Sequence, residues 1–557
     1  MKSKEQEKKS RLEHFRDLYE SASLAVSELH AGLEKNMNQY LGSDEIDGGE
    51  RASIVRNITF ELIESQISAD VPVPKVDTPC FSEEREENAR TIERLCSSLR
   101  DRLPFESMND LDERYTYIYG GSIWYVEWDN LLGGGSVHCI SPLCFIPQPG
   151  ISEIKDMEYC FLRFTTTRGE LMRKYGVSSE DSALALCEFQ YDGDFGSDTV
   201  SLVVCFYRDE SGEVGRFIFS GELTLSDTPK YYKRKKILCK KCGRLKENCS
   251  CGGTEPEIFD LDDEIISTTD GGFTTISYYT PRDFPIVIRK NSSAENQLLG
   301  NSDCQTIRPQ QQAINKLESR IMQKLLRAGI TPIMPEDSNV TLSNAVFGQV
   351  IRMRAGDSAD NYSTIDTTPD ISQDIEQANR LYDQAKRVLG ISDALQGTDS
   401  LTTESGYARE LKIAQASSRL ESKRRLKYLA YSEIYRLIFC HYLAFSDEPR
   451  PLHYLDSMGR HHFTEFNRHS FIESDGYGNL SYSDYYLFSV DLNDGSEYHR
   501  EALWQRNLTN LESGTLGDKS QPATLLRYWQ LQERAHYPFA RENVEYFKNL
   551  METDRKG

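Results

Sequence analysis

Long apolar runs, a surplus of positive charge and catalytic signature motifs are all missing from this sequence of 557 residues. No segment approaches the roughly 18 consecutive apolar residues that a membrane-spanning helix needs. The charged stretch 1–20 has no apolar centre, so we expect no signal peptide. The 65 Lys+Arg stand against 87 Asp+Glu, a net charge of −22. This balance argues against a protein that wraps nucleic acid by neutralising phosphates, although DNA could still slide past it without sticking.

Enzyme motifs are missing as well. The sequence has no G-x-x-x-x-G-K-[ST] phosphate-binding loop, no G-x-S-x-G elbow and no H-E-x-x-H zinc-protease motif. No pattern assembles a nucleophile, a base and an oxyanion site. We therefore expect a non-enzyme.

Cysteine is present 13 times, mostly scattered, which is typical of free thiols in a reducing cytoplasm. Four cysteines are clustered within 13 residues, at Cys239, Cys242, Cys249 and Cys251. Four thiolates satisfy tetrahedral zinc, so the cluster predicts a structural Zn²⁺ site that pins a β-hairpin excursion. The second pair is C-x-C and the spacer is short, so free or oxidisable thiols remain an alternative. The surrounding lysines could instead contact DNA or RNA.

Two other clusters could bind metal. His453, His461, His462 and His469 lie in one stretch, but an aromatic sheet explains them better because no helical pair with a Glu base occurs there. The acidic run 260–264 lacks a calcium-loop pattern, so we interpret it as a solvated loop.

Hydrophobic residues make up 38% of the chain, enough for packed cores. Periodicity predicts helices over 1–70, 82–102, 168–175, 300–329, 368–390, 403–445 and 497–557. The apolar stripe of the 368–390 helix consists of Ile371, Ile375, Ala378, Leu381, Ala385 and Val388. Aromatic and β-branched residues predict strands over 115–128, a hairpin over 200–219 within a mainly β region 115–285, and further strands over 453–491. The fold class that follows is α+β.

The order of these elements resembles the portal proteins of tailed double-stranded DNA bacteriophages. The segment 56–66 with the proline-rich 72–75 is similar to the family's N-terminal helix, and 284–288 leads into a long helix as the family's first stem helix does. The end of the chain, strand 487–492 followed by helices with Gly514 and Gly517, is similar to the last wing strand and the helical crown. The resemblance covers most of the chain as an order of elements and has no sharp signature.

The resemblance implies a portal-type fold with an α/β wing, a two-helix stem, a small β-containing clip, a long bent helix and a helical C-terminal crown. The implied boundaries are 1–285 for the wing with its cysteine insert 239–251, 286–329 for the first stem helix, 330–367 for the clip, 368–390 for the second stem helix, 391–402 for the tunnel loop, 403–495 for the long wing helix and wing strands, and 496–557 for the crown.

The resemblance also implies a homo-dodecameric ring at one capsid vertex of the virion, made in the host bacterial cytoplasm. Its implied partners are the major capsid protein, the terminase packaging ATPase, head–tail connector proteins and, transiently, double-stranded DNA, with no membrane. An ATPase in a separate protein fits the missing phosphate-binding loop. By position, the DNA-facing residues of the tunnel loop would be polar ones, Gln396, Thr398, Asp399, Ser400 and Thr402; a simple surface loop is the equal alternative.

Two rival functions remain open. One is a zinc-dependent nucleic-acid-processing protein that binds through 229–251. The other is a different structural virion protein, such as a connector or minor capsid component, which predicts no closed ring.

Overall fold

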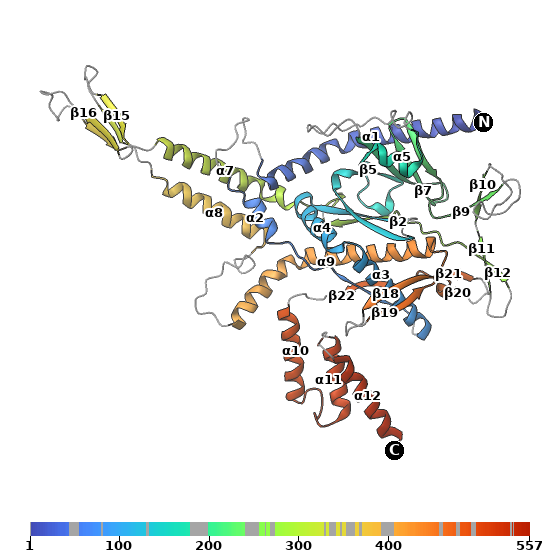
Figure 1. Cartoon of the computed structure of the whole chain (residues 1–557). Coiled ribbons are helices and arrows are strands. Elements are labelled where there is room, and N and C mark those ends of the chain that lie inside the picture. Colours follow the sequence, from blue (N-terminus) through green and yellow to red (C-terminus); the bar gives the residue numbers. More distant parts are fainter. Residues whose placement is uncertain are drawn as a thin grey trace.

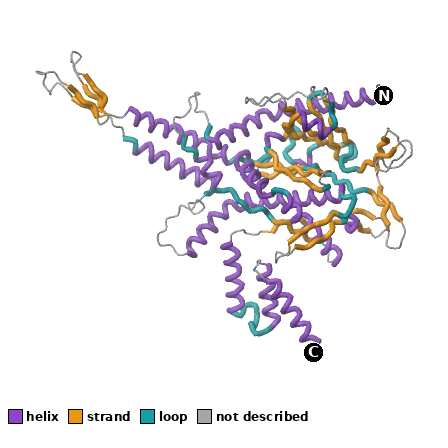
Figure 2. The backbone as a smooth tube through the Cα atoms, viewed as in Figure 1, coloured by secondary structure: helices purple, strands orange, loops and turns teal. Residues whose placement is uncertain are grey.

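The computed structural model describes residues 2–43, 55–79, 82–129, 133–178, 199–239, 256–261, 263–267, 273–293, 295–327, 330–333, 341–345, 348–352, 363–366, 370–391, 406–455, 461–474, 480–491, 497–534, 537 and 540–556. Helices hold 53% of the chain and strands 23%, so the predicted α+β class is confirmed. Figure 2 shows most strands gathered in a central body from which helical parts project.

A five-stranded antiparallel sheet forms one layer of the body. Its order is β4 (Phe145–Pro147), β5 (Tyr159–Thr167), β6 (Thr199–Arg208), β7 (Val214–Ser220) and β8 (Leu223–Thr228). Helix α1 (Lys2–Leu41) crosses one face, where Phe15 and Tyr19 pack against aromatic residues of the sheet. The predicted helix 168–175 is confirmed as α5 (Arg168–Tyr175), and the predicted hairpin as β6–β7.

The centre of the body is a three-stranded sheet in the order β13 (Ile286–Lys290), β2 (Gly121–Asp129) and β3 (Gly134–Ile140). Helices α3 (Glu83–Arg102), α4 (Phe105–Tyr119) and the 40-residue α9 (Gly406–Phe445) surround it. The largest core cluster joins Trp124 of β2 to the second half of α9, including Tyr431 and Tyr435. The prediction of one very long helix near 403–445 is therefore confirmed.

The prediction of a strand over 115–128 is wrong for its first third. Residues up to Tyr119 belong to α4, and the strand begins at Gly121. The β-prone aromatics are helical because α4 buries Phe105, Met108, Tyr119 and their neighbours against the core, which outweighs local propensity. Gly120 separates the two elements with φ of 89°, and a Cβ there would lie 2.1 Å from the carbonyl oxygen of Gly300, so only glycine fits.

Smaller antiparallel pairs complete the body. They are β1 (Val73–Asp77) with β22 (Leu487–Asp491), β9 (Arg234–Cys239) with β10 (Pro256–Leu261), β11 (Asp263–Ser267) with β12 (Phe273–Ser277), β18 (Arg450–Leu455) with β19 (His461–Phe466), and β20 (Ile472–Ser474) with β21 (Leu480–Tyr482). The 3₁₀ turns are η1 (Pro142–Cys144), η2 (Ile154–Asp156) and η5 (Arg468–Phe471).

Two helical units leave the body. Helices α7 (Asp303–Arg327) and α8 (Ser372–Leu389) form a hairpin that projects to one side, with β15 (Thr341–Ala345) and β16 (Gly348–Arg352) at its tip (Figure 1). The strands β14 (Ile330–Ile333) and β17 (Ser363–Asp366) pair with each other between the helices and the tip. At the other end of the chain, α10 (Glu497–Glu512), α11 (Pro522–Arg534) and α12 (Ala540–Lys556) extend below the body.

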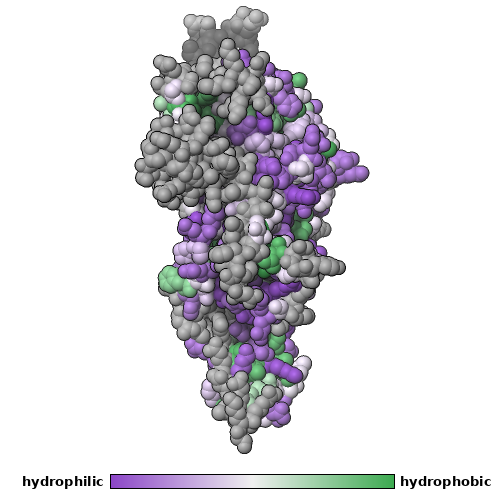
Figure 3. All heavy atoms as spheres, turned by 90° about the vertical axis from the view of Figure 1, so that its right-hand side faces the viewer, coloured by the Kyte–Doolittle hydropathy of each residue, from purple (hydrophilic) through white to green (hydrophobic). Residues whose placement is uncertain are grey.

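The mean hydropathy of the chain is −0.57. On the face shown in Figure 3, hydrophilic residues predominate and apolar residues form small separate patches. No helix in the described part of the chain is long and apolar enough to cross a membrane.

Candidate functional site: the base of the projecting hairpin

The α7–α8 hairpin is held together by a narrow apolar seam. Ile307 and Ile314 of α7 pack in one cluster with Ala385 and Leu389 of α8. Short α2 (Ile58–Glu64) adds its buried apolar face to the same cluster and thereby joins the hairpin to the body. Small alanines on α8 let the two helices approach closely, which favours a stiff hairpin.

Charged contacts tie the far half of the hairpin together. Lys324 of α7 hydrogen-bonds the Asp374 carboxylate of α8, and Arg320 lies 3.7 Å from the same carboxylate. Nearer the body, the Tyr382 hydroxyl donates to Glu61 of α2, and the Arg56 guanidinium lies 5.1 Å from the centre of the Tyr382 ring. Polar side chains therefore fix both the pairing of the helices and their angle to the body.

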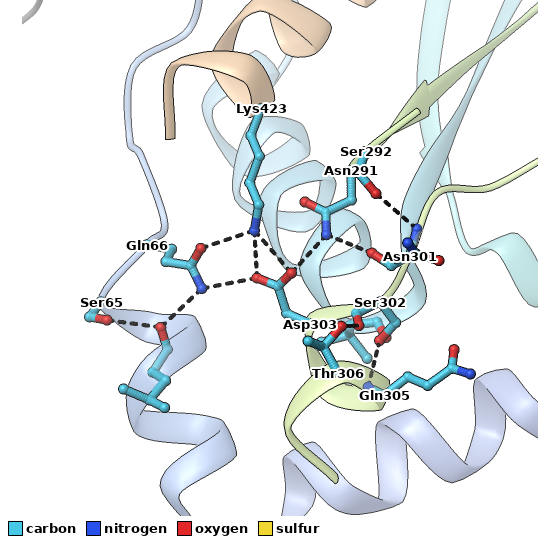
Figure 4. A network of polar contacts seen from close by, with 12 residues as sticks. Ser65, Gln66, Asn291, Ser292, Asn301, Ser302, Asp303, Gln305, Thr306 and Lys423 are labelled. Carbon is cyan, nitrogen blue, oxygen red and sulfur yellow. Dashed lines mark hydrogen bonds and ion pairs between the residues drawn. The ribbon is translucent and has the colours of Figure 1, made fainter. Parts of the chain in front are cut away.

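A network of hydrogen bonds anchors the start of α7, as Figure 4 shows. The Lys423 ammonium of α9 donates to both Asp303 oxygens, at 2.7 and 2.9 Å, and to Gln66 at 3.2 Å. Gln66 and Asn291 each donate an amide proton to the same carboxylate, at 3.0 and 2.8 Å. Ser302 caps the helix by accepting from the Gln305 amide. One carboxylate thus joins three regions that are far apart in the sequence, around residues 66, 291–303 and 423.

A second polar contact lies about two turns further along α7. Gln311, which is buried, accepts from both the amide and the hydroxyl of Thr59 at 3.0 Å. Its own amide donates to the Arg56 carbonyl at 2.8 Å and to Asn315 at 2.8 Å. A buried amide with all its groups paired specifies one register between α7 and α2.

The outer surface of the hairpin keeps apolar side chains exposed. Leu325 is 48% exposed, Ile375 44% and Val388 55%. Ile375 and Val388 belong to the helical stripe expected from the sequence, yet the partner helix α7 does not cover them. They are 13 residues apart, which places them about 140° apart around α8. A single copy therefore leaves apolar groups uncovered on two sides of this helix.

Beneath the hairpin lies a buried cluster of charges. The Arg289 guanidinium, 1% exposed, pairs with Asp112 and, at 2.8 Å, with Glu113. Lys427 of α9 lies 3.1 Å from Glu113 and donates to the Asp70 carbonyl at 2.8 Å. Burial opposes charge on Glu113, but Arg289 and Lys427 outweigh it and hold its pKa below the ordinary value. Burial lowers the pKa of Lys427, and Glu113 opposes that shift. The cluster clamps α4, β13 and α9 together.

The predicted zinc cofactor is wrong. Among the described residues, no three His, Cys, Asp or Glu side chains gather where they could hold a metal ion. Of the four predicted ligands, Cys239 ends β9, whereas Cys242, Cys249 and Cys251 lie outside the described residues. The excursion closes instead by backbone pairing of β9 with β10, in which Cys239 lies opposite Pro256. The described residues therefore give no positive support for a zinc site.

The other predicted site residues have separate outcomes. Gln396, Thr398, Asp399, Ser400 and Thr402 lie outside the described residues, between α8 and α9. Three of the four histidines lie in the β18–β19 pair, in which the His453 ring packs against Phe463 and the His462 ring stacks on Tyr454, whereas His469 lies in η5. The aromatic-sheet interpretation of these histidines agrees with this packing.

Sequence reasoning missed the Asp303 network and the Arg289 cluster. A signal was present for the second: Arg289 follows the apolar run 286–288 within a strand, and a cation in a buried strand needs a buried carboxylate partner. No comparable signal marked Asp303 and Lys423, because each lies in an ordinary polar helical stretch.

Neither protein-family profiles nor the sequences of curated proteins match this chain.

Proposed function

We propose that this chain is the protomer of a ring-shaped portal at one capsid vertex of a tailed bacteriophage, a conduit for packaging and ejecting double-stranded DNA. The observation that carries the proposal is the α7–α8 hairpin. It projects from an α+β body, ends in short paired strands and keeps apolar groups exposed on two sides of α8. A ring uses two different surfaces of each copy, so uncovered groups on two sides of one helix suit a heterologous interface.

In this proposal, residues 1–285 and 403–495 form the wing, and α7 and α8 are the stem helices within 286–329 and 368–390. Residues 330–367 form the clip, 391–402 the tunnel loop and 496–557 the crown. The clip would dock the packaging ATPase and then the head–tail connector, while the wing would meet the major capsid protein. The chain itself performs no catalysis, and its place is in the virion.

The free energy of association that the two exposed α8 side chains contribute is modest, but in a ring every interface would gain it. Fully burying a Val, Leu or Ile side chain contributes about 1.5–3 kcal/mol, so covering the exposed half of one such side chain at an interface contributes about 1 kcal/mol to association. Ile375 and Val388 together then contribute about 2 kcal/mol per subunit. That is about a 30-fold change in the association constant between neighbours.

The test is to image the purified protein by negative-stain electron microscopy and to average end-on views. We expect closed rings with an axial hole. Monodisperse particles near 63.8 kDa would contradict the proposal and favour another structural virion protein.

A matched pair of variants tests the stem directly. Ile375→Ser with Val388→Ser should weaken assembly about 30-fold per interface, measured by mass photometry over a concentration series. Leu24→Ser with Leu29→Ser removes two exposed leucines from α1 and should leave assembly unchanged. Equal effects of the two pairs would remove the stem from the interface.

A further inference from the structure

Three apolar side chains remain exposed where α1 ends beside α2. Leu41 is 65% exposed, Phe60 48% and Val55 36%. The two segments lie side by side, because the Asn57 amide donates to the Tyr40 carbonyl at 2.8 Å and the ring centres of Tyr40 and Phe60 are 5.2 Å apart. We call Leu41, Val55 and Phe60 the α2 patch.

The α2 patch faces away from the hairpin. Ile58 and Leu62 of α2 are buried in the cluster that holds α7 and α8 together. At about 100° per residue, Phe60 lies about 200° around α2 from Ile58 and about 160° from Leu62. Its ring therefore projects on the side of α2 that does not touch the hairpin.

A second uncharged surface runs along α8. Four positions spaced by three or four residues share one side of this helix and hold Gln377, Leu381, Gln384 and Val388, which we call the α8 strip. Leu381 is partly buried, and the other three are exposed. The rest of this 18-residue helix carries six charged side chains. The centre of a protein interface is poor in charged residues, so the α8 strip has the composition that an interface favours.

The α8 strip lies on the side of the hairpin opposite α2. On the α2 side, Arg56 donates to Asn379 at 3.3 Å, and the Tyr382 hydroxyl donates to Glu61. Val388 lies about 180° around α8 from Asn379 and about 120° from Tyr382. The α2 patch and the α8 strip therefore project from opposite sides of the hairpin.

The α2 patch and the base end of the α8 strip lie at the same height along the hairpin. Leu389, which follows Val388, packs in one cluster with Ile58 and Leu62, which flank Phe60 in α2. Figure 1 shows α2 beside the base of the hairpin. Rotation about an axis parallel to the hairpin preserves height, so neighbours in a closed ring meet through opposite sides at equal height.

Solvent exposure alone does not account for this arrangement. Single exposed apolar side chains are common on soluble proteins, and either surface by itself would need no explanation. Two uncharged surfaces on opposite sides and at equal height form the pair that a heterologous interface requires.

We propose that the α2 patch of each copy packs on the α8 strip of the next copy in the ring. The inference rests on the proposed ring and names the surfaces through which its subunits meet. The occupant of each surface is a second copy of this chain. Each copy offers the α2 patch to one neighbour and the α8 strip to the other, so the contact continues around the ring and does not stop at a dimer.

Chemical cross-linking of the full-length chain tests this contact. Phe60→Cys with Val388→Cys places one thiol in each surface, and a short bis-maleimide joins thiols that lie close together. Leu24→Cys with Val388→Cys is the matched control, because Leu24 is exposed and lies about 25 Å along α1 from Leu41. The parent protein and the single variants measure the reaction of the native cysteines. All three positions are exposed, so the substitutions leave the core unchanged.

We expect the Phe60→Cys and Val388→Cys double variant to give a ladder of linked chains on a denaturing gel, because each copy reacts with both neighbours. The control and the single variants should give only the products of the parent protein. Products that stop at two chains would overturn the inference, since they indicate an isologous pair. Cross-linking no greater than in the control would also overturn it.

Serine variants measure whether the two surfaces touch. Phe60→Ser and Val388→Ser should each weaken assembly about fivefold, measured by mass photometry over a concentration series. The double variant should weaken assembly by less than the product of the two effects, because both substitutions remove the same contact. Effects that multiply in full would contradict the contact.

Electron microscopy of the same samples separates this inference from the proposed function. Closed rings without the ladder would keep the ring and remove this contact. A ladder from particles that form no closed ring would keep the contact and remove the ring.

Discussion

His441 makes the stability of the body depend on pH. This residue of α9 is 0% exposed and lies against the rings of Tyr231, Tyr232 and Phe445. Its Nδ1 lies 2.8 Å from the Leu437 carbonyl, which can only accept, so Nδ1 carries the proton. The other ring nitrogen, Nε2, is buried without a hydrogen-bond partner. A proton added there would create a buried charge without a counter-ion.

The loss of stability at low pH can be calculated from the lowered pKa of His441. Burial lowers the pKa of His441 from 6.5 to about 4, opposed by the Leu437 carbonyl. Between these two pH values His441 is protonated in the unfolded chain but not in the folded chain, so falling pH favours unfolding. The contribution is complete above the unfolded pKa and is lost progressively down to pH 4. At pH 5 the free energy of unfolding should be about 2 kcal/mol lower than at pH 7.5 from this group alone.

Urea unfolding at pH 7.5 and pH 5 measures this loss. Trp128 packs against Tyr442 and Phe445 of the same core, so tryptophan fluorescence reports on the relevant region. Replacing Trp504 and Trp529 of the C-terminal helices by Phe removes their signal. In this background, His441→Phe should remove about 2 kcal/mol of the pH dependence. His14→Phe, at an exposed position on α1, should leave it unchanged.

Equal losses of stability in His441→Phe and the parent protein between pH 7.5 and pH 5 would show that His441 does not cause the pH dependence. Titration of His441 near pH 6.5 in the folded chain, measured by nuclear magnetic resonance, would show that its ring is solvated or paired.

The remaining predictions concern the buried charges. Arg289→Met leaves Asp112 and Glu113 without their main counter-ion, so hydrogen exchange of the β2 amides should show a free energy of unfolding that is about 3–5 kcal/mol lower. Adding Glu113→Gln to this variant should recover part of that loss. Purely additive effects of the two substitutions would show that the two side chains do not interact. Lys423→Met should destabilise the first turn of α7 by about 1.5–3 kcal/mol, which faster proteolysis at the base of the hairpin would detect. The control Arg425→Met should leave the rate of proteolysis unchanged. Equal cleavage of both variants would contradict the anchoring role of Lys423.

Local pattern predicted the elements well where one signal dominated. The helices over 168–175 and 403–445 were found because no proline interrupts either of them and Gly176 ends the first. The region around Tyr115 was misjudged because its aromatic residues favour strand locally, whereas tertiary packing of α4 favours helix. Local strand propensity contains no information about tertiary packing.

The candidate site was less accessible to sequence reasoning. The stripe on α8 predicted an apolar seam, and Ala378 and Ala385 are buried as that seam requires. The same stripe could not show that Ile375 and Val388 would stay exposed, because the tertiary fold decides which helix packs against α8 and how much of the stripe it covers. The Asp303–Lys423 contact joins residues 120 positions apart, and periodicity carries no information at that separation.

The buried charges also set an order of events during synthesis. Glu113 and Asp303 depend on cations of α9, so a growing chain carries Glu113 for more than 300 residues before Lys427 is made. At about 5–20 residues per second that interval is about 15–60 s. Until α9 arrives, α4 and β13 hold more buried acid than base, and the start of α7 has no lysine to hold it. The body therefore closes late, and a chain that stops before α9 lacks the lysine that fixes the base of the hairpin.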